Sequence, residues 1–265
     1  MFSGFAGAMI RASIKLMRIL LANANTTEAI TGLCATAGRA AASPGTEIVP
    51  ATPRFGPAVI ATRVENAIAG HALLELLAEY AGKVDGVLLA VSHDTALDAA
   101  RQLMPCPVLG MTEAACLVAM TQGGRFGLVT FGGVEMYREL LDRHGFSARL
   151  AGLAGVAATP QESLADPADV AAKVQVAVAS LVAQGADSVV LGGAAMAGMG
   201  ARLAAEVPLL DGIACGVRLL EALAGLRLRR PAQGSYAAPT GRAAVGIAPV
   251  LAALLGQGPV AVTDR

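Results

Sequence analysis

The chain has 265 residues, of which 55% are hydrophobic and only 15% are charged. A chain of this length can bury a complete core, as one large domain or as two small ones. Its 20 basic side chains match its 20 acidic ones, so the charge balance does not favour nucleic acid or an anionic membrane as a partner.

Membrane, secreted and zinc proteins are also disfavoured. Charged residues interrupt every apolar stretch before it reaches the roughly 18 residues that a membrane span requires. The N-terminal segment lacks the continuous apolar core of a secretory signal, so we expect a cytoplasmic protein with reduced cysteines. None of the four cysteines belongs to a CxxC pair or has histidines at ligand spacing, so we expect no metal site.

The folded part is expected to begin near Met17, after an N-terminal extension of residues 1–16. The first predicted strand starts at Arg18 and ends in a polar turn that contains Asn23, Asn25 and Thr26. Amide and hydroxyl groups at the start of a helix can bind a ligand or cap the helix. Both interpretations stay open for these three residues.

The next predicted strand, residues 87–91, ends at Ser92-His93-Asp94-Thr95. A short run that is apolar on both faces is typical of a buried parallel strand, and open α/β sheets bind ligands beyond the carboxyl ends of such strands. Consecutive residues cannot form a serine-hydrolase triad. His93 could act alone as a general base, with Ser92 binding an oxyanion. The alternative is a helix start capped by Ser92 or Asp94.

The chain repeats this pattern. Residues 18–28 resemble residues 125–135, and residues 85–93 resemble residues 187–195. Each half then has a strand opened by proline, which leads to Glu113 in the first half and to Asp211 in the second. Glu113 could orient a base or stabilise a hinge, and Asp211 could orient a base. The turns equivalent to those of the first half contain Thr130, Gly193 and Ala194.

This repeat predicts an α/β fold of two pseudo-symmetric β/α subdomains with parallel sheets and an active-site cleft between them. The first subdomain should span residues 17–115 and the second residues 116–212. Residues 213–265, with helices near 213–226 and 246–255, should rejoin the first subdomain. Equivalent turns on two walls suit proton removal from one face of a carbon and return to the other, with backbone N–H groups stabilising the enolate.

Several motifs, taken together, resemble the aspartate/glutamate racemase superfamily and its hydantoin racemase-like branch over residues 18–225. They are Ile19-Leu-Leu-Ala-Asn-Ala-Asn-Thr-Thr27, Asp94–Arg101, Pro107–Ala115, Arg125–Thr130 and Gly185–Gly192. The resemblance implies a cofactor-independent mechanism with two catalytic bases, one cysteine in each half. The two cysteine positions of that branch fall on Val91 and Gly193 of this chain, so both thiols are missing.

Three other residues have simpler interpretations. Cys116 and Cys215 could replace the missing thiols as a displaced pair, but their Ala and Leu neighbours favour small buried hydrophobes. His71 lies within a helical pattern, which favours helix packing over catalysis because catalytic groups should lie at strand ends.

The sequence therefore predicts a cofactor-independent isomerase without the usual cysteine pair. Its substrate would be a small carboxylate, an amino-acid derivative or a hydantoin-like cyclic amide. The expected catalytic residues are His93 and Ser92, and the expected substrate-binding residues are Asn23, Asn25, Thr26, Val91, Thr130, Gly193 and Ala194. A decarboxylase or tautomerase, and a catalytically silent ligand-binding protein, are the alternatives. The high apolar content favours a homo-oligomer.

Overall fold

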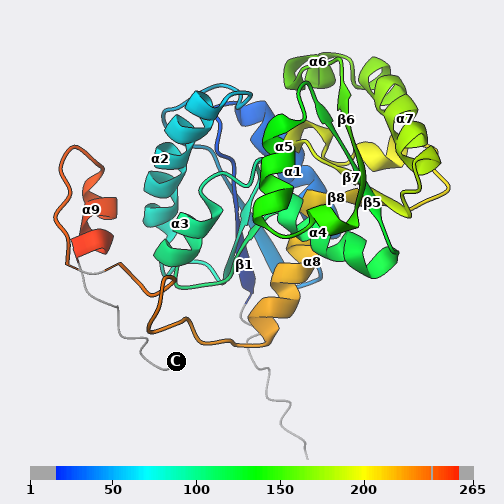
Figure 1. Ribbon diagram of the computed structural model, residues 1–265. Coiled ribbons are helices and arrows are strands. Elements are labelled where there is room, and N and C mark those ends of the chain that lie inside the picture. Colours follow the sequence, from blue (N-terminus) through cyan, green and yellow to red (C-terminus); the bar gives the residue numbers. More distant parts are fainter. Residues whose placement is uncertain (1–15, 240, 257–265) are drawn as a thin grey trace, which may run out of the picture.

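The computed structural model describes residues 16–239 and 241–256. They form two parallel four-stranded sheets, with the strand orders β2-β1-β3-β4 and β6-β5-β7-β8, and helices cover the sheets (Figure 1). The equivalent strand order in both sheets confirms the predicted α/β fold with two pseudo-symmetric halves. Apart from Leu16, the predicted extension of residues 1–16 lies outside the described part of the chain.

The first sheet is followed along the chain by the second. The first contains β1 (Met17–Ala22), β2 (Thr46–Ala51), β3 (Gly86–Leu89) and β4 (Val108–Gly110), and the second contains β5 (Phe126–Phe131), β6 (Leu150–Val156), β7 (Ser188–Leu191) and β8 (Leu209–Asp211). The helices are α1 (Glu28–Ala41), α2 (Arg63–Tyr80), α3 (Leu97–Leu103), α4 (Met111–Gln122), α5 (Glu135–Arg143), α6 (Pro160–Ala165), α7 (Pro167–Ala183), α8 (Gly212–Gly225) and α9 (Pro249–Gly256). Among these residues, no helix combines the length and the hydropathy needed to cross a bilayer.

Strand β3 shows why the interior strands are mainly apolar. Val87 and Leu89 pack into the cluster on one face of the first sheet, together with residues of α2 and α3. Leu88 and Ala90 pack into the cluster on the other face. Helices cover both faces of a parallel sheet, so its central strands are apolar on both sides along most of their length.

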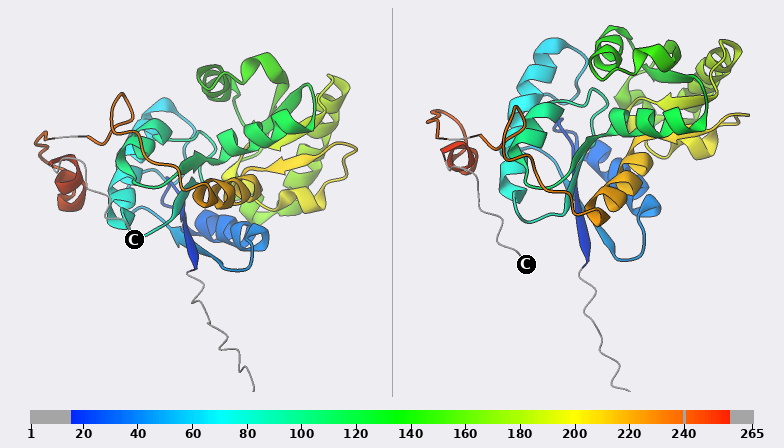
Figure 2. Two further views of the ribbon diagram at one scale, coloured as in Figure 1. Left: turned by 90° about the horizontal axis from the view of Figure 1, so that it is seen from below. Right: turned by 60° about the horizontal axis from the view of Figure 1, so that its bottom comes forward.

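Helix α8 follows the second sheet in the chain but packs on the first. Its buried residues Ile213, Val217 and Leu220 belong to the same cluster as Ile19 of β1 and Leu88 of β3. Leu251 of α9 packs into the opposite cluster, beside α2. The segment that connects α8 to α9 runs back along the first half (Figure 2). The exact subdomain boundaries stay a prediction.

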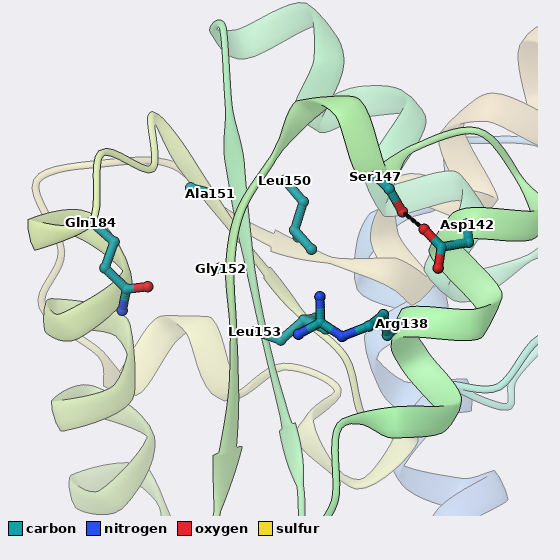
Figure 3. Close-up of a pocket in the computed structure, with 8 residues that line it drawn as sticks. All are labelled: Arg138, Asp142, Ser147, Leu150, Ala151, Gly152, Leu153 and Gln184. Atoms are coloured by element: carbon teal, nitrogen blue, oxygen red, sulfur yellow. Dashed lines mark hydrogen bonds between the residues drawn. The ribbon is translucent and has the colours of Figure 1, made fainter.

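The edge strands β2 and β6 are absent from our predictions. β2 has the sequence TEIVPA and contains a proline, and β6 has the sequence LAGLAGV, which is rich in glycine and alanine. Proline, glycine and alanine have low strand propensity. Both strands exist because each pairs with a buried neighbour, β1 for β2 and β5 for β6. The other side of β6 is the free edge of the second sheet (Figure 3).

Candidate active site

A cavity of about 470 Å³ lies between the two halves. The loops after β1, β2 and β3 form one wall, and the loops after β5, β6 and β7 form the other. This is the carboxyl end of both sheets, where α/β proteins bind ligands. The lining residues are Asn25, Ile30, Val59–Arg63, Val91–His93, Phe131–Gly133, Glu135–Tyr137, Thr159–Gln161 and Gly193–Ala195.

Val91 and Gly193 occupy equivalent places on the two walls. Each lies two residues beyond the end of the third strand of its half, β3 or β7, and both line the cavity. Val91 is almost fully buried, at 4% exposure. A side chain at Gly193 would place its Cβ 3.0 Å from the Phe131 ring. Neither residue carries a group that exchanges protons.

Backbone N–H groups at the same strand ends are available to a ligand. Those of Ser92 and His93 on one wall, and of Ala194 and Ala195 on the other, donate to no acceptor within the described ranges. All four residues line the cavity. Convergent backbone donors of this kind bind oxyanions and carboxylates.

Hydrogen bonds to α4 and α2 hold the turn of residues 92–95 in place. The Asp94 carboxylate accepts hydrogen bonds from the N–H groups of Thr112 at 3.0 Å and Glu113 at 2.8 Å, at the start of α4. The Thr112 hydroxyl donates to the Ser92 carbonyl at 2.7 Å. The Thr95 hydroxyl donates to Asn66 at 2.6 Å. These contacts fix the backbone that presents His93 to the cavity.

This arrangement corrects the alternative in which Ser92 or Asp94 caps the next helix. The N-cap of α3 is Ala96, and no side chain caps that helix. Asp94 and Ala96 both adopt positive φ, at 46° and 55°. That backbone directs the Asp94 side chain toward α4, which begins at Met111. Burial raises the pKa of the Asp94 carboxyl to about 8, and the N–H donors of Glu113 and Thr112 act in the opposite direction.

His93 is the only histidine that lines the cavity within the described part of the chain. Its side chain is largely buried, and its ring lies 4.6 Å from the Tyr137 ring, centroid to centroid, with a tilt of 36°. Burial lowers the pKa of the imidazole to about 4. His93 is therefore uncharged at neutral pH, with one ring nitrogen able to accept a proton.

Tyr137 of α5 joins the two walls. Its hydroxyl donates to the Gly192 carbonyl at 3.0 Å, next to Gly193, and lies 2.7 Å from the Ser92 hydroxyl, next to Val91. Because its one proton goes to Gly192, Ser92 donates to Tyr137. Burial raises the pKa of Tyr137, and hydrogen bonds from Ser92 and Thr130 oppose that shift. The phenol is therefore neutral and fixed between the two strand ends.

The structure separates the predicted binding residues into two groups. Six of the eleven predicted site residues line the cavity: Asn25, Val91, Ser92, His93, Gly193 and Ala194. Asn23 does not, because its side-chain amide is buried and donates to Asn25 at 2.9 Å and to Thr31 at 3.0 Å. Thr26 also lies outside the lining, with its N–H bonded to the Pro57 carbonyl. Thr130 is buried behind Tyr137.

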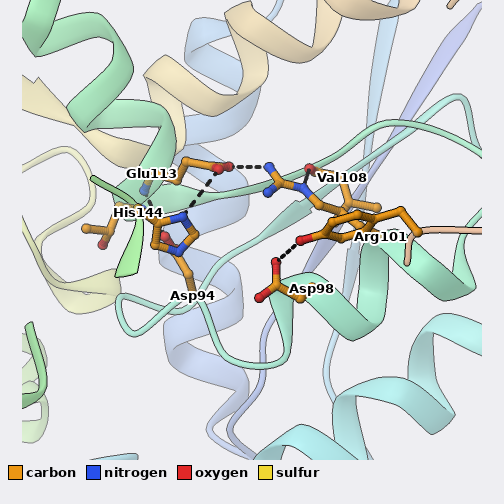
Figure 4. A network of polar contacts seen from close by, with 8 residues as sticks. Asp94, Asp98, Arg101, Val108, Glu113 and His144 are labelled. Carbon is orange, nitrogen blue, oxygen red and sulfur yellow. Dashed lines mark hydrogen bonds and ion pairs between the residues drawn. The ribbon is translucent and has the colours of Figure 1, made fainter. Parts of the chain in front are cut away.

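The two carboxylates with a predicted orienting role also lie outside the lining. Glu113 pairs with Arg101 at 2.5 Å and faces His144 at 3.8 Å (Figure 4). Asp211 caps α8 and accepts a hydrogen bond from the Gly198 N–H at 2.6 Å. Either residue can reach the cavity only through a neighbouring turn, and its orienting role stays a prediction.

Sequence reasoning missed Tyr137, Phe131 and the two loops that precede α2 and α6. These loops are equivalent: Thr62 and Glu65 form a capping box at α2, and Thr159 and Glu162 form one at α6. The pattern Thr-x-x-Glu is a signal that could have located both helix starts. Tyr137 follows the turn after β5 by a few residues, and no local pattern marks it.

The structure places Cys116 and Cys215, the two candidates for a displaced thiol pair, away from the cavity. Cys116 and Cys215 pack into a hydrophobic cluster of the second half, and no cysteine is among the lining residues. Burial raises the pKa of both thiols, that of Cys215 to about 11. Within the described ranges, no group of three His, Cys, Asp or Glu side chains is placed to hold a metal ion.

His71 lies on α2, outside the cavity lining. Its ring bonds to Glu75 at 3.1 Å and makes an edge contact with Phe55.

Comparison with known proteins agrees with this architecture. The family model described as Asp/Glu/Hydantoin racemase matches residues 19–220. The chain is 32% identical over 236 residues to the hydantoin racemase of Paenarthrobacter aurescens, an alignment that covers 84% of this chain and 98% of that protein. The hydantoin racemase of Rhizobium meliloti is 30% identical over 240 residues, which cover 87% of this chain and 98% of that protein.

Solved structures give the same result. An allantoin racemase from Klebsiella pneumoniae is 34% identical, with a TM-score of 0.84 over 89% of this chain and 98% of its own. A structure of an arylmalonate decarboxylase mutant, at 19% identity and a TM-score of 0.54, covers 83% of this chain and 98% of its own and shares the fold. The protein is thus an isomerase of the racemase superfamily that acts on a small molecule. The chain belongs to the Asp/Glu/Hydantoin racemase family, on its hydantoin racemase-like branch.

Proposed function

We propose that this protein is a cofactor-independent racemase or epimerase that works without a cysteine pair and uses His93 for proton transfer. The observation that carries the proposal is the cavity itself. Two equivalent strand ends face it with free backbone N–H groups, and an uncharged imidazole lies on one wall. We also propose that it works in the cytoplasm as a homo-oligomer, with no nucleic-acid or membrane partner.

The proposed chemistry begins with removal of a proton from the carbon next to a substrate carbonyl. His93 accepts that proton, and the electron pair moves to the carbonyl oxygen. The N–H groups of Ser92, Ala194 and Ala195 then stabilise the resulting oxyanion. Such stabilisation is the largest single contribution to catalysis in many enzymes. A water molecule on the Gly193 wall, opposite His93, then gives a proton to the other face of the carbon, and the electron pair returns from the oxygen to the carbon. The hydroxide that remains takes up the proton released by His93, so that water and the uncharged imidazole are restored and the other enantiomer is formed.

A largely uncharged substrate fits the cavity best. The charged side chains that line the cavity are Arg63 and Glu135, both exposed and of opposite sign. The interior is formed by apolar side chains, backbone amides, hydroxyls and the neutral His93. A cyclic amide of the hydantoin or allantoin type, the substrates named in the similar racemases, therefore suits this cavity better than a dicarboxylate. Small carboxylates and amino-acid derivatives remain in the proposed substrate class.

One observation favours a second function. Among the lining residues, His93 is the single histidine, and Val91 and Gly193 hold no titratable group. A decarboxylase or tautomerase needs the oxyanion pocket but delivers its proton to one face alone. An asymmetric site of this kind suits that reaction as well as racemisation.

The decisive experiment follows hydrogen exchange at the reacting carbon. The full chain is incubated in D₂O with one enantiomer each of allantoin and a 5-substituted hydantoin, with a protein-free control. We expect catalysed deuterium incorporation together with loss of optical rotation. Carbon dioxide release from a 2-substituted malonate would favour the decarboxylase. Thermal stabilisation by these compounds without any turnover would identify a silent ligand-binding protein and overturn the proposal.

A second prediction concerns Tyr137. The substitution Tyr137→Phe keeps the ring beside His93 and removes the hydroxyl that joins Ser92 to the Gly192 carbonyl. We expect a loss of about 10- to 100-fold in exchange rate, because the two walls lose their common anchor, and a cost of about 1–3 kcal/mol in unfolding free energy from the buried partners. Exchange kinetics and urea unfolding measure the two effects.

Tyr236→Phe is the matched control. It removes the same atom from an exposed tyrosine, bonded to Asp98 at 2.7 Å. Equal exchange rates in the two variants would contradict a role for Tyr137 in the site.

A further inference from the structure

The turn of residues 193–196 on the second wall presents the N–H groups of Ala194 and Ala195 to the cavity. In a trans peptide the carbonyl and the N–H point in opposite directions, and the described residues contain no cis peptide bond. A hydrogen bond to a carbonyl of this turn therefore also fixes the direction of the N–H group in the same peptide. Two side chains from outside the turn make such bonds.

Ser163 of α6 acts on the Ala194 N–H through two peptide groups. Its buried hydroxyl donates to the Ala195 carbonyl at 2.8 Å. The other side of that peptide carries the Met196 N–H, which donates to the Gly193 carbonyl at 2.8 Å. The peptide that joins Gly193 to Ala194 is held by this second bond, and its N–H is the one that faces the cavity.

Cys34 of α1 acts on the Ala195 N–H through one peptide group, from the opposite half of the molecule. Its Sγ lies 3.4 Å from the Ala194 carbonyl oxygen. Burial raises the pKa of the Cys34 thiol, so the thiol keeps its proton and can donate it to this carbonyl. The peptide that accepts the bond carries the Ala195 N–H on its other side. Ala194 and Ala197 pack in the same apolar cluster as Cys34, which holds the turn against the first half.

The two walls are thus supported in different ways. On the first wall, Asp94, Thr112 and Thr95 hold the turn that contains His93, and all of these residues belong to the first half. On the second wall, the bonds come from α6 and from α1 across the interface of the two halves. A hydrogen bond at the carbonyl also polarises the peptide and strengthens its N–H as a donor.

We propose that Ser163 and Cys34 are positioning residues for the reaction. Each fixes one of the two peptide groups whose N–H stabilises the substrate oxyanion from the second wall. Neither side chain lines the cavity within the described ranges, so both act through the turn and touch no substrate. This inference rests on the proposed function, because it assigns the two N–H groups to the oxyanion.

The substitution Ser163→Ala separates this role from a role in packing. The oxyanion forms only as the reaction proceeds, so kcat for deuterium exchange into one enantiomer of allantoin should fall about 10- to 100-fold while KM changes less than about threefold. Ser163→Cys keeps a weaker donor and should lose less. Both kcat values are referred to the folded fraction, measured by circular dichroism. An unchanged kcat, or a loss that appears in KM alone, would overturn the proposal.

Ser188→Ala is the matched control for Ser163→Ala. It removes a buried hydroxyl from β7, the strand that leads into the turn, and that hydroxyl has no hydrogen-bond partner among the described residues. This variant should keep the wild-type kcat. Equal losses in Ser163→Ala and Ser188→Ala would show that any small change in this part of the core has the same effect, and would contradict a positioning role.

The same design applies to the thiol. Cys34→Ala should lower kcat about 3- to 10-fold, less than Ser163→Ala, because a thiol is a weak donor. Cys116→Ala removes the same group from another fully buried cysteine, which bonds to no acceptor in the described part of the chain. It should leave kcat unchanged. Equal effects of the two cysteine substitutions would exclude Cys34 from the proposal.

Amide hydrogen exchange reads the turn without any substrate. The Met196 amide should exchange at least about tenfold faster in Ser163→Ala than in the wild type, because its bond to Gly193 loses its support. The Thr112 and Glu113 amides, which support the first wall, should not change. Unchanged exchange at Met196 would overturn the proposal even if kcat falls. A wild-type chain that exchanges no substrate would instead refute the proposed function, and Met196 would still show whether Ser163 holds the turn.

Discussion

Replacing His93 with asparagine is expected to lower the rate of deuterium exchange by a factor of about 10² to 10⁴, the usual contribution of a general base. Asparagine retains a polar side chain of similar reach and removes the proton-accepting ring nitrogen. On the acidic side of the pH profile, the wild-type rate should stay constant down to about pH 5. Below that it should fall as the pH approaches the His93 pKa of about 4.

The same substitution should also change how the free energy of unfolding depends on pH, which can be measured without a substrate. Burial lowers the His93 pKa from 6.5 to about 4. Between these values the unfolded chain binds a proton that the folded chain does not, so this residue's contribution is complete above pH 6.5 and is lost as the pH falls to 4. His93→Asn removes this loss, which amounts to roughly 3 kcal/mol at pH 4. Urea unfolding of both proteins at pH 4 and pH 7 measures the difference.

His71→Asn is the control for the exchange measurement. His71 is 45% exposed and bonds to Glu75 on its own helix. This substitution should leave the exchange rate unchanged. An exchange rate that survives His93→Asn would remove His93 from the mechanism and direct attention to Tyr137 and solvent water.

The second large effect concerns the support beneath the active site. A methyl group at Gly110 would lie 2.1 Å from the Asp94 carboxyl carbon. Asp94 cannot move away, because it is buried and holds the N–H groups of Thr112 and Glu113. We expect Gly110→Ala to cost about 3–5 kcal/mol in unfolding free energy, from overpacking and from a buried carboxyl separated from its donors. The residual folded protein should also lose activity, since Asp94 adjoins His93.

Gly32→Ala is the matched control. Gly32 lies in α1, and apart from its chain neighbours and the backbone of its own helix, no described atom lies within 4 Å of the position its Cβ would take. The same substitution there should stabilise the protein by about 0.5–1 kcal/mol through the backbone entropy of the unfolded chain. Urea unfolding compares the two. A cost below about 1 kcal/mol at Gly110 would show that Asp94 can rearrange.

The central strands could be predicted from the sequence, but the edge strands could not. Val87–Leu89 and their counterparts in the second half are continuously apolar because helices cover both faces of each sheet. Such a run is visible in any chain that needs it. β2 and β6 carry no comparable signal, since the partner strand stabilises them more than their own residues do.

The polar turns show the same limit at the site. The sequence places Asn23 and Asn25 in one turn, and a ligand role is equally plausible for each. The fold uses the Asn23 amide to hold Asn25 and Thr31, so that Asn25 alone reaches the cavity. Likewise, positive φ at Asp94 directs that carboxyl to α4 and away from the helix that follows it in the chain.

The sequence by itself determined the duplicated α/β architecture, the family and the strand ends at which the cavity lies, because repeats, apolar runs and motifs are local or periodic. The tertiary structure decided which polar groups face the cavity, that Tyr137 joins Ser92 to Gly192, and that the loops before α2 and α6 complete the walls. Those contacts join residues tens of positions apart. Their geometry depends on how the two sheets meet, which no local pattern of residues records.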